Sequence, residues 1–201
     1  MAESIKIEIF RKKDADDFTK ALADPESRAQ TGSGAAMTAA VSAALLERAA
    51  RIAQESNTDN ERLDYLVRNG EILRNYMVNL IDEDVKARGP YRRACKEGDP
   101  RKLEAATQVA GAVCSEIVGM MGKGLELLEE LAELCPEDAR HLVAESADLA
   151  LAAVRACMRV CVYWGDQSSE DTRRYVIRRE NELQWEEIFA CYQRVIKKCE
   201  E

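Results

Sequence analysis

The chain has 201 residues, of which 46% are hydrophobic and 33% charged, and its formal net charge is −8. This length and balance predict one globular domain spanning residues 1–201. The acidic charge argues against general nucleic-acid binding, which needs a basic face. Only four prolines, 5% aromatic residues and long runs of Ala, Leu, Glu and Arg favour helices over strands.

The N-terminal segment and the cysteines indicate the cellular compartment. The first residues, MAESIKIEIFRKKDADD, contain no apolar core of a signal peptide, and no apolar run in the chain is long enough to span a bilayer. The seven cysteines are an odd number and lie mostly in helix-like segments, which is typical of reduced thiols in a cytosol. We therefore expect a soluble, cytoplasmic protein that does not partner a membrane.

The first elements are short. Residues 1–13 could form a short strand or an arm, because isoleucine alternates at positions 5, 7 and 9. A helix is expected at about 14–23, with Asp14 as its N-cap. The stretch from Pro25 to Gly34 is typical of a loop, and an alanine-rich helix of about 24 residues follows it.

The rest of the chain predicts further helices separated by clear breaks. Gly89 and Pro90 end one helix, "KEGDP" interrupts the chain again, and Pro136 suits the first turn of a new helix. The predicted helices cover about 59–87, 91–96, 100–134, 137–165 and 170–200. The helix over 137–165 is nearly all apolar and should be the central, most buried one. The fold class is therefore all-α, an antiparallel bundle of five to six helices.

Three consecutive acids occur in "NLIDEDVKARGPY", near the end of the helix over 59–87. At about 100° per residue, Asp84 lies within roughly 60° of that helix's apolar stripe. Asp82 falls on nearly the opposite side, and Glu83 lies between the two. The apolar stripe consists of Leu73, Met77, Leu80 and Ile81. This geometry predicts Asp84 as the carboxylate that faces the interior.

An inward carboxylate has two interpretations here. Burial removes hydration and raises the pKa of a carboxyl group unless a cation or donors compensate, so such a group can serve as a general acid or base near neutral pH. Alternatively, Asp84 lies past the end of the core, solvated or paired with Arg88 four residues later. The pattern alone leaves both open.

The central helix carries polar side chains on one face. They either pair between helices or line a ligand cavity, where the arginines would receive an anionic tail such as glutamate carboxylates. Tyr163 and Trp164, at the end of this helix, could pack in the core or stack on a planar ligand. The polar residues are Glu145, Asp148, Arg155 and Arg159.

The single histidine gives little support for a metal site. His141 lies four to five turns from Cys157 and Cys161 on the same helix, so a shared metal is conceivable, but structural cysteines are the favoured interpretation. We predict no metal and no tightly bound cofactor.

Several segments together resemble one known family, in order and spacing over nearly the whole chain. The family is that of formiminotetrahydrofolate cyclodeaminases and methenyltetrahydrofolate cyclohydrolases, which are all-helical homodimers. The segments are "FTKALADP", "TGSGAAMTAAVSAALLERAARIA", "LIDEDVKAR", "EAATQVAGAVCSEIVGMMGKGLELLEEL" and "SADLALAAVRACMRVCVYWGD".

The resemblance implies an enzyme that acts on a carbon–nitrogen bond of a one-carbon-loaded tetrahydrofolate, its small-molecule substrate. The second Asp of the family's Asp-x-Asp motif transfers the proton, and Asp84 matches it. Gly32, Ser33 and Lys96 match positions at the substrate, and Arg159 is a further candidate contact. The resemblance also implies a homodimer.

The sequence departs from the family pattern at several of these positions. The triple-glycine loop is reduced to Thr31-Gly32-Ser33-Gly34, and the family's Pro-Lys appears as Cys95-Lys96. Where the family has Ser-Asp and two asparagines, this chain has Arg140-His141, Arg159 and Tyr163. A catalytically diverged homologue that binds a ligand or a partner is therefore the alternative, with a related enzyme acting on another amidine or cyclic substrate as a third option.

Overall fold

The computed structural model describes residues 8–201, so most of the predicted N-terminal strand or arm lies outside the described residues. Its described end forms a short 3-10 helix, η1 (Phe10–Lys12), and not a strand. Helix α1 (Ala15–Ala23) follows, and Asp14 caps it as predicted, accepting a hydrogen bond of 2.8 Å from the Asp17 backbone N–H.

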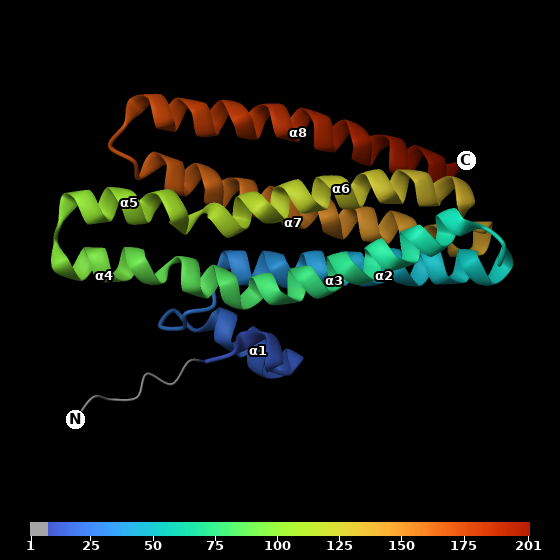
Figure 1. Cartoon of the computed structure of the whole chain (residues 1–201), viewed down its shortest axis with the longest axis horizontal. Coiled ribbons are helices and arrows are strands. Elements are labelled where there is room, and N and C mark those ends of the chain that lie inside the picture. Colours follow the sequence, from blue (N-terminus) through green and yellow to red (C-terminus); the bar gives the residue numbers. More distant parts are fainter. Residues whose placement is uncertain (1–7) are drawn as a thin grey trace.

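Five long helices of 23 to 30 residues form the bundle. They run alternately up and down along one long axis, and two shorter helices form a hairpin at one end (Figure 1). No strand occurs between residues 8 and 201, which confirms the predicted all-α antiparallel bundle. The long helices are α2 (Thr31–Ser56), α3 (Glu61–Ala87), α6 (Ala112–Leu134), α7 (Arg140–Asp166) and α8 (Asp171–Glu200), and the hairpin consists of α4 (Gly89–Glu97) and α5 (Pro100–Ala110).

Helix α7 lies in the middle of the bundle, as its apolar sequence predicts. It is not the most buried helix, and that part of the prediction is wrong, because α2 buries 13 of its 26 residues and α7 buries 11 of its 27. Helix α7 packs against α2, α6 and α8, and a second 3-10 helix, η2 (Glu137–Ala139), leads into it. Small side chains let α2 and α7 approach closely. At their crossing Ser42 and Ser146 donate to each other's backbone carbonyl at 2.8 Å, which satisfies two buried hydroxyl groups.

Two helix boundaries differ from the prediction, each for a local reason. Helix α2 begins at Thr31, so Gly32 and Gly34 lie in its first turn and not in a loop. The predicted helix over 100–134 is split at Gly111, between α5 and α6. A Cβ at Gly111 would lie 3.4 Å from the Cβ of Trp164, so glycine lets the break pack closely against α7.

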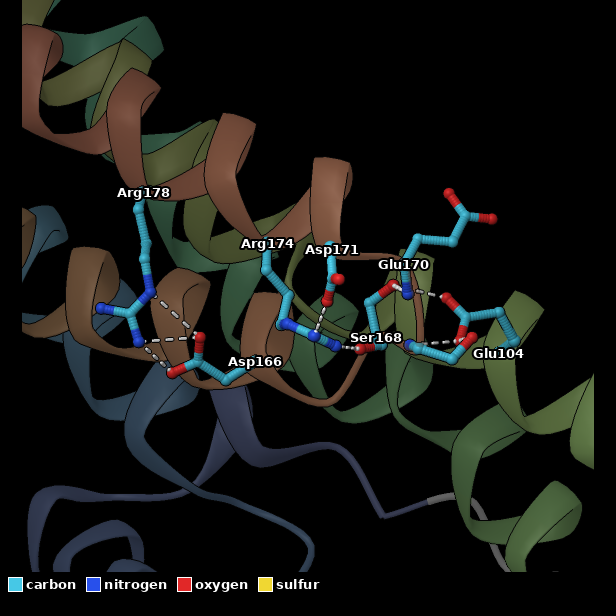
Figure 2. A network of polar contacts seen from close by, with 8 residues as sticks. Glu104, Asp166, Ser168, Glu170, Asp171, Arg174 and Arg178 are labelled. Carbon is cyan, nitrogen blue, oxygen red and sulfur yellow. Dashed lines mark hydrogen bonds and ion pairs between the residues drawn. The ribbon is translucent and has the colours of Figure 1, made fainter.

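A surface network fixes the turn between α7 and α8 (Figure 2). Glu104 of α5 accepts hydrogen bonds from the Ser168 hydroxyl at 2.7 Å and from the Ser169 backbone N–H at 2.8 Å. On the α8 side, Arg178 pairs with Asp166 at 2.7 Å. These contacts join the hairpin end of the molecule to the start of α8. Among residues 8–201, no helix has the length and apolar character needed to cross a membrane.

Candidate functional site

Asp84 lies near the end of α3, with none of its surface exposed. Its Oδ2 accepts a hydrogen bond of 3.1 Å from the Ser33 backbone N–H and lies 3.2 Å from the Ser33 hydroxyl. The first N–H groups of a helix have no partner within the helix, and the helix dipole there favours an anion. Asp84 of α3 therefore anchors the start of α2, and the predicted inward direction is confirmed.

Gly32 makes this anchoring possible. A Cβ at position 32 would lie 2.1 Å from Asp84 Oδ1, closer than any side chain can approach. The Ser33 hydroxyl also lies 3.0 Å from the Ile81 carbonyl, one turn before Asp84. The structure thus brings together three of the predicted site residues, Gly32, Ser33 and Asp84. The small-residue stretch and the acid motif carry the sequence signal for this arrangement.

Arg88 covers Asp84 and is itself 6% exposed. Its Nη2 donates to Asp84 Oδ1 at 3.0 Å, and its Nη1 donates to the side-chain oxygen of Gln30. Its Nε is buried without a hydrogen-bond partner. The pairing of Asp84 with Arg88, one of the two interpretations of the sequence, therefore occurs, but inside the protein and not in solvent.

A cavity of about 590 Å³ opens next to Arg88. Arginines and aromatic residues dominate its lining, and no acidic residue contributes to it. Burial, together with the positive charges of Arg28 and Arg88, lowers the pKa of Arg92 below its ordinary value. The cavity therefore has a positive wall. Its lining residues are Gln30, Thr31, Arg88, Tyr91, Arg92, Ala156, Arg159, Val160, Tyr163 and Trp164.

The two aromatic residues at the end of α7 have different environments. Trp164 is buried and packs edge to face against Tyr91, with ring centroids 4.7 Å apart, and against Tyr163 at 5.2 Å. Tyr163 is 56% exposed. Core packing therefore accounts for Trp164, whereas the ring of Tyr163 is accessible at the cavity.

The polar residues on one face of α7 serve both of the roles considered for them, contact with another helix and lining of a cavity. Asp148 accepts a hydrogen bond of 2.7 Å from the Tyr192 hydroxyl, and Arg155 lies over the Trp185 ring at 5.4 Å, so both contact α8. Arg159 instead lines the cavity. Lys96 is exposed on α4 and does not line this cavity, so its role at the substrate stays a prediction.

Asp82 is the acid that the helical geometry of α3 does not account for. It lies away from the apolar stripe, yet it is only 8% exposed. Its Oδ1 accepts hydrogen bonds from the backbone N–H groups of Phe10 at 2.7 Å and Arg11 at 3.4 Å. The η1 segment covers this side of α3, which a single-helix analysis cannot detect. The two acids thus hold the starts of two different helices.

The described residues give no support to a metal site. Within residues 8–201 no group of His, Cys, Asp and Glu is arranged to hold a metal ion. His141 is exposed, and its Nδ1 lies 2.9 Å from the Asp138 carbonyl oxygen.

The fold and site define an all-α bundle of the cyclodeaminase type. The structure of formiminotetrahydrofolate cyclodeaminase from Thermotoga maritima superposes with a TM-score of 0.87 at 23% sequence identity, covering 94% of this chain and 96% of that one. The family model described as formiminotransferase-cyclodeaminase matches residues 14–163. The chain belongs to this family, as its sequence motifs predict. No curated protein sequence matches it.

Proposed function

We propose that the chain is a folate one-carbon enzyme that acts on a carbon–nitrogen bond of a tetrahydrofolate derivative. The reaction would be that of a formiminotetrahydrofolate cyclodeaminase or a methenyltetrahydrofolate cyclohydrolase. The observation that carries this proposal is the buried carboxylate of Asp84, held by the start of α2 behind a cavity with room for a planar ring. Family membership supports the same substrate class.

Asp84 would transfer the proton that either reaction needs. Ring closure of the formimino compound expels ammonia, so a proton must reach the leaving amine. Hydration of the methenyl bridge requires a proton to be removed from water. One carboxylate can serve both. Because Arg88 lies between Asp84 and the cavity, its guanidinium would have to move aside for the proton to pass.

The remaining predicted residues would position either the Asp84 carboxylate or the substrate. Gly32 and Ser33 fix the Asp84 carboxylate, and Arg159 and Tyr163 line the cavity into which the substrate would enter. Lys96 stays a candidate contact to the substrate. We also propose a homodimer, as the family resemblance implies.

A specific observation favours the alternative, a non-catalytic homologue that binds a ligand. Asp84 has no exposed surface, and its partner Arg88 is buried over it. A carboxylate held in this way has a structural role, because its oxygens already accept hydrogen bonds from a backbone N–H and a guanidinium.

A spectrophotometric assay with 5-formiminotetrahydrofolate and 5,10-methenyltetrahydrofolate tests the proposal. Turnover of either compound by the wild type, lost in Asp84→Asn while circular dichroism shows a folded protein, is the expected result. The compound that is turned over would also identify which of the two reactions the protein catalyses. Binding of both compounds without turnover by the wild type would contradict the enzymatic proposal and favour the ligand-binding homologue.

A further inference from the structure

Small side chains supply the buried surface of the hairpin that α4 and α5 form. The buried residue of α4 is Ala94, and those of α5 are Ala106, Thr107 and Ala110. In the described part of the chain, the continuous hydrophobic core includes the long helices but none of the buried alanines of the hairpin. Small side chains remove little apolar surface from water when they are buried. The position of the hairpin therefore depends on specific contacts.

Each helix of the hairpin contacts the end of α7. From α4, Tyr91 packs edge to face against Trp164, with ring centroids 4.7 Å apart. From α5, Glu104 binds the turn that follows α7 (Figure 2). Its Oε1 accepts a hydrogen bond of 2.7 Å from the Ser168 hydroxyl. Its Oε2 accepts hydrogen bonds from the backbone N–H and the hydroxyl of Ser169, both at 2.8 Å. Both oxygens of one carboxylate thus join α5 to this turn.

The Glu104 contact is stronger than an ordinary surface hydrogen bond. Three donors hold one carboxylate, and a hydrogen bond to a charged acceptor is about twice as strong as a neutral one. Ser168 is 2% exposed, so little water can replace Glu104 at its hydroxyl. The ion pair of Arg178 and Asp166, beside the same turn, instead joins α8 to α7. The Glu104 contact is therefore the one of the two that fixes the hairpin.

The hairpin in turn supplies part of the wall of the cavity beside Arg88. Tyr91 and Arg92 of α4 line this cavity. Its other lining residues belong to α7 or lie at the start of α2 and the end of α3, and these long helices are held together by the core. A shift of the hairpin would therefore move Tyr91 and Arg92 relative to the rest of the site, including Asp84.

We propose that Glu104 is a positioning residue for the site. Through Ser168 and Ser169, it holds the α4–α5 hairpin against the end of α7. The position of the hairpin then sets where Tyr91 and Arg92 meet the substrate. Glu104 does not itself line the cavity. The inference rests on the proposed function for the identity of the substrate, whereas its structural half rests on the hairpin contacts alone.

The fluorescence of Trp164 measures the hairpin contact without any substrate. The chain has two tryptophans, so a Trp185→Phe background leaves Trp164, which packs against Tyr91, as the single emitter. In that background Glu104→Ala should raise the acrylamide quenching constant about twofold or more, because local opening of the hairpin uncovers the indole ring. The matched control is Arg178→Ala, which breaks the ion pair beside the same turn. Unchanged quenching in Glu104→Ala, or equal increases in the two variants, would overturn the inference.

Steady-state kinetics separate positioning from a general structural role. On a tetrahydrofolate compound that the wild type turns over, Glu104→Ala should raise KM about fivefold and leave kcat within about twofold, because substrate binding weakens while Asp84 is unchanged. Glu104→Gln keeps the side-chain length and one acceptor oxygen, so it should restore part of the wild-type KM. Arg178→Ala should keep the wild-type KM. Equal KM values for the two alanine variants, or a loss in kcat alone, would overturn the inference.

The two tests fail separately from the proposed function. All variants are compared after circular dichroism shows the helical content of the wild type. If the wild type turns over neither tetrahydrofolate compound, the proposed function fails, and the quenching comparison alone decides whether Glu104 holds the hairpin. Turnover by the wild type with unchanged quenching and KM in Glu104→Ala would overturn this inference and leave the proposed function in place.

Discussion

Asp84 and Glu104 form similar bonds in two different regions of the molecule. Each accepts a hydrogen bond from a serine backbone N–H near the start of a helix, Ser33 in α2 and Ser169 just before α8. Each also lies within hydrogen-bond distance of a serine hydroxyl. Asp84 is completely buried and has an arginine partner, whereas Glu104 lies at the surface, where Figure 2 shows it beside the turn.

The difference shows how burial changes the consequence of the same bonds. The hydrogen bonds from the Ser169 backbone and from the Ser168 and Ser169 hydroxyls lower the pKa of Glu104 to about 2, and water helps to solvate its charge. Asp84 has no water to replace a lost partner, so removing its carboxylate leaves the buried charge of Arg88 unpaired. The buried acid should therefore matter more for stability than the surface acid does.

The largest effect is expected for Asp84→Ala. It should lower the free energy of unfolding by about 3–5 kcal/mol, because it breaks a buried ion pair and leaves Arg88 uncompensated. Urea denaturation of both proteins measures the difference. A loss below about 1 kcal/mol would show that Arg88 reaches solvent when its partner is removed, and the contrast with Glu104 would disappear.

Gly32→Ala should have the next largest effect and lower the free energy of unfolding by about 3 kcal/mol. The new Cβ would lie 2.1 Å from Asp84 Oδ1, so either the carboxylate or the first turn of α2 must shift. Gly34→Ala is the matched control in the same turn, since its nearest atom would be Leu22 Cδ1 at an ordinary 3.5 Å. Equal melting temperatures for the two variants would contradict the close fit at Gly32.

Asp82→Ala should lower the free energy of unfolding by about 2 kcal/mol, less than Asp84→Ala and more than Glu104→Gln. It removes the acceptor for the backbone N–H groups of Phe10 and Arg11, which are otherwise held against α3. Hydrogen–deuterium exchange should show faster exchange at Phe10 than in the wild type. Unchanged exchange there would mean that the burial of the Phe10 ring alone holds η1 in place.

The smallest effect is expected for Glu104→Gln, which should lower the free energy of unfolding by about 1 kcal/mol at pH 7. Because the folded protein lowers the pKa of Glu104 from 4.5 to about 2, its contribution is present above pH 4.5 and is lost as the pH falls toward 2. Wild type and variant should therefore converge in stability at acidic pH. A difference that grows as the pH falls would contradict the assigned sign.

The sequence predicted those features that depend on one helix at a time. The Asp14 cap, the apolar α7 and the inward direction of Asp84 follow from spacing and residue type. What could not be predicted depends on contacts between segments distant in sequence. The cover of η1 over Asp82 and the Gln30–Arg88 contact are of this kind.

The residue at which α2 begins also depends on a contact with a segment distant in sequence. Glycines at 32 and 34 suggest a loop locally, but the bond from Ser33 to Asp84, 51 residues away, stabilises a helical first turn. The break at Gly111 likewise reflects its contact with Trp164. Local propensity is a weak guide where tertiary contacts supply the missing hydrogen bonds.

The most direct measurement compares kcat/KM of Asp84→Asn and Asp82→Asn with that of the wild type on the two proposed substrates, 5-formiminotetrahydrofolate and 5,10-methenyltetrahydrofolate. Both acids are buried on the last turns of α3, so each variant controls for the general effect of losing a carboxylate there. We predict a loss of about 100-fold or more for Asp84→Asn, typical of a removed general acid or base, and near wild-type activity for Asp82→Asn. Equal activity of the two folded variants would contradict the assignment of proton transfer to Asp84.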